Sequence, residues 1–134
     1  VLQKGVEGRL LLGHQPHDLG FQFIKNADRE IFLLVCLNTR NHINCIHVVS
    51  IGTVNTALVA PREVLKAAIL SNASSVAFIH NHPSGDPTPS EADIKVTRDL
   101  IRAGQLLKIE VLDHIVVGRP SFQSLRALGY FAAF

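Results

Sequence analysis

Two histidines, a serine and an aspartate occur at short spacing in the run HNHPSGDPTPSEAD, which covers residues 80–93. His80 and His82 end an apolar, strand-like run, and side chains alternate across a strand, so the two imidazoles are predicted to point the same way. Asp93 follows His82 by 11 residues and falls in the first turn of a helix that Ser90 is placed to cap. Two imidazoles and one carboxylate, with water as the fourth ligand, form a known catalytic zinc arrangement. The spacing therefore allows one metal ion to be shared by these three side chains.

Purely structural roles are the alternative for the same residues. The string SEAD is close to a capping box, in which Ser90 accepts a backbone hydrogen bond and the acid at Asp93 favours the helix dipole. A pair of histidines at the end of a strand is, taken alone, more often structural or solvated than metal-bound. Pro83, Pro87 and Pro89 lower the entropic cost of holding the connecting loop in one shape, and the occurrence of all these features together favours the metal site.

The elements that must position these residues follow from the hydrophobic periodicity. The run REIFLLVCLN (29–38) is apolar and predicts a strand buried on both faces, and the polar NTRN that follows predicts a hairpin turn. The order of elements predicts one α/β domain with a mixed sheet flanked by helices. The remaining expected elements are strands at 42–52, 75–80 and 108–118, helices at 61–72 and 90–107, and a short strand and helical turn after Pro120.

The N-terminal part of the chain carries weaker signals. Pro16 introduces PHDLGFQFIKN, which predicts a short helix, so residues 1–27 are expected to form a helical lead-in and residues 28–134 the metal-binding domain. The chain begins at Val1 and contains no methionine, which predicts that it is a fragment of a longer chain.

Composition excludes several classes of protein. With 47 % apolar and 18 % charged residues in 134, the chain is not expected to be disordered, and it is long enough for one domain with a core. A net charge of +2 is too small to argue for nucleic-acid binding by itself. No apolar run approaches the roughly 20 residues that span a bilayer, and no signal peptide is evident, so a soluble cytoplasmic protein is expected. Cys36 and Cys45 lie in strand-like runs and are expected to be free thiols rather than a disulfide.

The motif resembles that of a known enzyme family. The arrangement His-x-His, seven residues, then Ser-x-x-Asp is similar to the motif of the JAMM (MPN+) metalloproteases. The segments REIFLLVCLNTRN and LLKIEVLDHIVVG, in the same order, resemble the bacterial RadC family, and the resemblance extends over residues 28–126. It implies an MPN (JAMM)-like domain of cytidine-deaminase-like architecture that holds one Zn²⁺ per chain through His80, His82 and Asp93.

The resemblance also assigns two catalytic residues. Glu30 matches the glutamate that JAMM enzymes use as general acid and base, although a glutamate that merely begins a strand at the surface is the alternative. Ser90 matches the serine that donates a hydrogen bond to the developing oxyanion, and this role is expected to compete with helix capping. His114 is expected to be a satisfied strand histidine, and the alternative is that it supports the metal site with Asp113 beside it as a hydrogen-bond partner. The other histidines, His14, His17, His42 and His47, are expected to be surface or packing residues.

Three functions are compatible with these patterns. The first is a zinc-dependent hydrolase that cleaves a peptide or isopeptide bond, with an extended peptide added to a strand near residues 47–55. The second is a DNA-associated module, as the historical DNA-repair name of RadC implies, with Lys95, Arg98 and Arg102 on phosphates. A solvated helix face is the more ordinary explanation of that basic stripe. The third is a non-catalytic MPN scaffold for an unknown protein partner, against which the complete ligand set argues.

Overall fold

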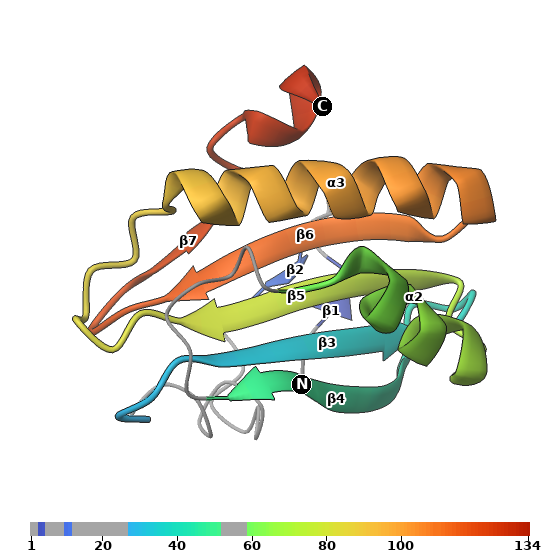
Figure 1. The fold of residues 1–134 in the computed structure, drawn as a ribbon, viewed down its shortest axis with the longest axis horizontal. Helices are drawn as coiled ribbons and strands as arrows, with labels where there is room; N and C mark the ends of the chain where they lie inside the picture. The colour runs from blue at the N-terminus through green and yellow to red at the C-terminus, as the bar shows by residue number, and fades with distance from the viewer. Residues whose placement is uncertain (1–2, 5–9, 12–26, 52–58) are drawn as a thin grey trace.

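The computed structural model of the chain describes residues 3–4, 10–11, 27–51 and 59–134 (Figure 1). Its centre is a five-stranded sheet with the strand order β4-β3-β5-β6-β7, and a separate antiparallel pair is formed by β1 and β2. The elements are β1 (Gln3–Lys4), β2 (Leu10–Leu11), β3 (Ile31–Leu37), β4 (Ile43–Ile51), α2 (Pro61–Leu70), β5 (Ser75–Asn81), α3 (Glu91–Leu107), β6 (Glu110–Val117), β7 (Phe122–Ser124) and the 3₁₀ helix η2 (Tyr130–Ala133).

The sheet is mixed, as the order of elements predicts. Strand β3 pairs antiparallel with both β4 and β5, whereas β5 and β6 are parallel. A parallel pair needs a crossover connection, and α3 supplies it, running alongside β6 (Figure 1). Strand β7 returns antiparallel to β6 and ends the sheet. This arrangement brings the end of β5 and the start of α3 to the same end of the sheet.

Strand β3 is buried on both faces, which confirms the prediction from its unbroken apolar run. One face of the sheet packs against α2 and α3, whose Val64 and Leu100 join Phe32 and Phe78 in a single cluster. The opposite face holds a second cluster, of Ile31, Leu33, Val35, Leu37, Ala77, Ile79, Leu112, Ile115 and Val117. The strands that carry the candidate site are therefore rigidly packed.

The two main helices begin where their start signals predict. Pro61 is the first residue of α2, and Ser90 is the N-cap of α3. The strand expected within residues 121–129 is β7, and the helical turn expected there is a hydrogen-bonded turn at 125–129, after which a 3₁₀ helix follows at Tyr130–Ala133. Both cysteines are free thiols, as expected. In the part of the chain that the structure describes, no helix combines the length and apolar character that crossing a bilayer requires.

The N-terminal prediction is only partly covered by the structure. Within residues 1–27, for which the sequence predicts a helical lead-in, residues 3–4 and 10–11 form the short antiparallel strands β1 and β2 and not a helix. The helix predicted at 16–26 lies outside the described residues, as do His14 and His17.

Candidate metal centre

Three of the predicted residues meet at the carboxyl end of β5. His80 lies in β5, His82 follows its last residue, and Asp93 lies in the first turn of α3. Their ligand atoms all lie within 4.8 Å of one another. The Asp93 carboxylate sits between the two rings, with Oδ1 3.1 Å from His80 Nε2 and Oδ2 3.1 Å from His82 Nε2. The structure thus brings together two imidazole nitrogens and one carboxylate that could hold a metal ion.

The tautomer of His80 follows from a chain of buried hydrogen bonds. Thr97 Oγ1 donates its one proton to the Asp93 carbonyl at 2.7 Å, so it must accept its second hydrogen bond, from His114 Nδ1. Burial holds the pKa of His114 well below its usual range, so this ring is neutral and its Nε2 carries no proton. His114 Nε2 therefore accepts from His80 Nδ1, 2.7 Å away. His80 Nδ1 therefore carries a proton, and Nε2 is the nitrogen that faces Asp93.

His82 is oriented in the same way by the loop. Its Nδ1 lies 2.9 Å from the Asp86 carbonyl, which can only accept, so Nδ1 carries a proton. Its Nε2 is then left to face Asp93. Without a cation, the hydrogen bond to Asp93 raises the pKa of His82, because the second proton is stabilised by the carboxylate.

The donor set fits a divalent metal ion. His80 Nε2 is fully buried and makes no hydrogen bond to any residue that the structure describes, although Asp93 Oδ1 is close. A buried nitrogen without a partner is costly, and a cation would satisfy it. Burial by itself raises the pKa of Asp93, but its contacts with both imidazoles outweigh burial and hold that pKa well below its usual range. Two neutral nitrogens and one carboxylate are ligands that zinc accepts.

Ser90 and Asp93 also form the capping box that the structural alternative predicts. Ser90 Oγ accepts from Asp93 N at 3.1 Å, and Asp93 Oδ2 accepts from Ser90 N at 2.8 Å. The capping box and the metal site are therefore not alternatives, because the box fixes the carboxylate that faces the imidazoles. The structure shows Ser90 capping the helix, and the expected competition between capping and donation stays a prediction. The hydroxyl accepts in the cap and keeps its own proton for donation.

Glu30 lies beside the three ligands rather than at the open surface. It directly precedes β3, is 7 % exposed, and its Oε1 lies 3.7 Å from His80 Nε2. Burial raises the pKa of Glu30, while the two imidazoles partly oppose that effect. A raised pKa makes this carboxylate a stronger proton acceptor than an ordinary glutamate.

Asn81 fixes the backbone on both sides of Glu30. Its Oδ1 accepts from Ile31 N at 2.7 Å, and its Nδ2 donates to the Arg29 carbonyl at 2.8 Å. Because Asn81 points to the opposite face of β5 from its histidine neighbours, this contact ties the glutamate to the histidine strand without entering the site. The residue between the two histidines therefore has a positioning role that the sequence analysis did not anticipate.

The loop from His82 to Ser90 is held against the turn after β6. Gly85 adopts φ +93°, a conformation that favours glycine, and its carbonyl accepts from Arg119 N at 2.8 Å. A Cβ on Gly118 would lie 2.3 Å from the same carbonyl, so only glycine allows this approach. These contacts hold the loop in the shape that brings Asp93 close to His80 and His82.

Asp113 and His114, two neighbouring residues of β6, make different contacts. Asp113 accepts from Ser124 Oγ and from two backbone amides, so it supports the β6–β7 corner and not the ring of His114. His114 is a satisfied strand histidine, as expected, but its partner is the candidate ligand His80, a contact that sequence reasoning missed. Thr97 was also missed, although its spacing four residues after Asp93 on one helix was visible.

The basic stripe expected on the second helix is interrupted by an acid. Lys95 and Arg102 are exposed on α3, whereas Arg98 Nε lies 3.8 Å from Asp99 Oδ1. This mixed charge matches an ordinary solvated helix face.

Comparison with known proteins gives one family. The sequence model of the family described as "RadC-like JAB domain" matches residues 15–130. The chain is 49 % identical over 106 residues to a UPF0758 protein of Desulforamulus reducens, which covers 79 % of this chain and 47 % of that protein. It is 52 % identical over 108 residues to a UPF0758 protein of Caldanaerobacter subterraneus, and these residues cover 81 % of this chain and 46 % of that protein. A UPF0758 protein of Methanosarcina barkeri is 45 % identical over 114 residues, which cover 85 % of this chain and 50 % of that protein. The chain therefore spans about half the length of these relatives.

Proposed function

This chain belongs to the RadC-like JAB domain family, and from that membership and its site geometry we propose that it is a zinc-dependent hydrolase of the JAMM type. The proposed reaction is the cleavage of a peptide or isopeptide bond by activated water. One observation carries the proposal. His80 and His82 both commit Nδ1 to hydrogen bonds and turn Nε2 toward Asp93, with Glu30 alongside.

Zinc is the proposed ion because of the donors and their number. Imidazole nitrogen and carboxylate oxygen both suit zinc, and three protein ligands leave one position of a tetrahedron for water or substrate. The His82 side chain is 18 % exposed, so the proposed substrate would reach the site on the side of His82. Zinc bound there would supply Lewis acidity, which acidifies water and polarises a carbonyl group.

Glu30 is the proposed proton carrier. Its raised pKa and its place beside His80 suit a carboxylate that takes a proton from the attacking water and passes it to the leaving amine. Ser90 is the proposed donor to the carbonyl oxygen as negative charge develops on it. The exposed Ser90 hydroxyl retains its proton because the helix cap uses it only as an acceptor.

A peptide is the proposed substrate because of the neighbouring strand. Among the described residues, β4 pairs only with β3, which leaves its outer edge available for an extended chain. Ile51 at the end of β4 is in register with Ile31, the residue after Glu30. A peptide added along β4 would therefore run toward the proposed proton carrier.

The proposal is tested by metal content and by hydrolysis. Protein purified without an affinity tag is expected to lose one zinc per chain in His82→Ala, and the wild type is expected to cleave members of a peptide library. Glu30→Gln, which keeps the shape but loses the ionisable group, should retain the metal and lose cleavage. Equal zinc in wild type and His82→Ala would refute the site. Metal-loaded protein that cleaves no peptide but binds DNA with a steep salt dependence would favour the DNA-associated alternative.

A further inference from the structure

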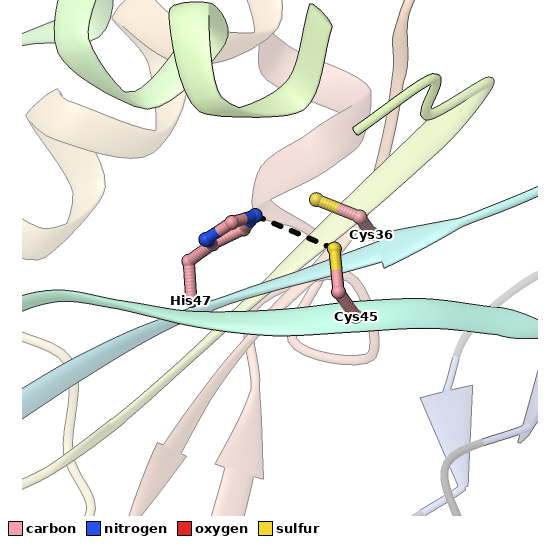
Figure 2. Close-up of side chains that lie close together, drawn as sticks. All are labelled: Cys36, Cys45 and His47. Atoms are coloured by element: carbon pink, nitrogen blue, oxygen red, sulfur yellow. Dashed lines mark hydrogen bonds between the residues drawn. The ribbon is translucent and has the colours of Figure 1, made fainter. Parts of the chain in front are cut away.

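A second cluster of metal-ligating side chains lies away from the first site. Cys36 of β3 and Cys45 of β4 are direct partners in the antiparallel ladder, and His47 lies two residues further along β4 on the same face. Figure 2 shows both sulfur atoms and the His47 ring turned into one space beside the sheet. One ligand atom from each residue lies within 4.8 Å of the other two.

The cluster is closed by the end of helix α2. His47 Nε2 lies 3.3 Å from Cys45 Sγ and 2.7 Å from the hydroxyl of Ser71, the C-cap of α2. Cys36 is fully buried, while Cys45 and His47 are half-buried. The carboxyl end of a helix carries partial negative charge, which favours a cation at this place.

This group has the composition of a thiolate metal site. Two sulfurs and one imidazole nitrogen converge, and soft sulfur ligands select zinc or Cu(I) over magnesium or calcium. We propose that Cys36, Cys45 and His47 bind one Zn²⁺ ion, with the Ser71 hydroxyl at the open side. The ion would fasten the edge strand β4 to β3 and to the end of α2.

This second site is independent of the first in place and in chemistry. Cys36 lies four residues along β3 from Phe32, the partner of His80, so the two sites are about 13 Å apart along the strand. The first site offers only nitrogen and oxygen donors, whereas the second offers sulfur. Burial, together with Cys45, raises the pKa of the Cys36 thiol to about 12, so without a cation this thiol stays protonated. A bound cation would supply the charge that the buried thiolate needs.

Cobalt(II) distinguishes the two sites, because only a thiolate site gives a sulfur-to-cobalt charge-transfer band in the near ultraviolet. The experiment titrates CoCl₂ into reduced His82→Ala, in which the first site is disabled. The expected result is a band that saturates at one cobalt per chain. The band should vanish in His82→Ala/Cys45→Ser and persist in His82→Ala/His42→Ala, a control that removes an exposed histidine just before β4.

A second measurement needs no substitution. Zinc is expected to slow the reaction of the Cys45 thiol with a disulfide reagent in the wild-type chain, by a factor that grows with the ratio of free zinc to its dissociation constant. Absence of the cobalt band together with zinc-independent thiol reactivity would overturn the proposal.

Discussion

Replacing Thr97 by valine tests whether the chain of hydrogen bonds behind His80 prepares it for a metal ion. Valine keeps the β-branched shape and removes the hydroxyl that joins the Asp93 carbonyl to His114 Nδ1. The Nδ1 proton of His114 then lacks its acceptor and can move to Nε2. That tautomer points a proton at His80 Nδ1, so His80 must move its own proton to the nitrogen that faces Asp93.

Two magnitudes follow from this structure. In either tautomer the buried His114 Nδ1 loses its partner, and a buried polar group without a partner costs about 1–3 kcal/mol, so the free energy of unfolding of the metal-free protein should fall by that amount. Loss of a group that orients a metal-bound histidine lowers metal affinity by roughly 10–100-fold. That loss equals about 1.4–2.7 kcal/mol of binding free energy, consistent with one tautomer-fixing hydrogen bond.

The assay is a competition titration of zinc against a chelator, made in the Cys45→Ser background so that only the first site is measured. Thr97→Ser is the matched control, because it retains the hydroxyl and should bind zinc nearly as tightly as its parent. Urea unfolding of the same proteins without metal separates the stability effect from the binding effect. A folded Thr97→Val that binds zinc as tightly as Thr97→Ser would refute the proposed relay.

Three further predictions concern the surroundings of the site and the cysteine cluster. Asn81→Ala is expected to lower stability by about 1–3 kcal/mol and to slow any hydrolysis while metal content is unchanged, since it frees the backbone around Glu30 and leaves the ligands in place. Loss of metal without loss of rate in that variant would contradict this role. Gly118→Ala should lower the free energy of unfolding by about 1–3 kcal/mol, because its Cβ meets the Gly85 carbonyl; a neutral effect in urea unfolding would show that the loop can move. The metal-free protein should lose stability as pH rises above about 9, where the unfolded Cys36 thiol ionises, until about 12, where the folded one does. Unfolding curves across this range should show that loss in wild type and less of it in Cys36→Ala.

The local features of the site could be predicted from the sequence, because they depend on short-range geometry. Alternation along a strand places His80 and His82 on one side, and the Ser90 cap places Asp93 in the first turn of α3. The continuous apolar run of β3 predicts burial on both faces. Each of these inferences uses the backbone period of a single element, which one sequence contains.

The supporting partners depend on how distant strands register with one another. Val111 pairs with Val76, but Asp113 pairs with Ala77, so β6 contains one extra residue at this point. Such a bulge changes which face the following side chains occupy, and it turns His114 toward His80 where simple alternation from Val111 would turn it away. No period in the sequence reveals that extra residue.

The cysteine cluster also depends on the register between strands. Cys36 and Cys45 are nine positions apart, with a hairpin turn between them, and the ladder of β3 and β4 carries two register shifts. Ser71 reaches them only because α2 packs on that face of the sheet. The sequence by itself determined the ligand types and their spacing. The tertiary structure alone decided which side chains share one space, because strand register and helix packing are set by the whole core.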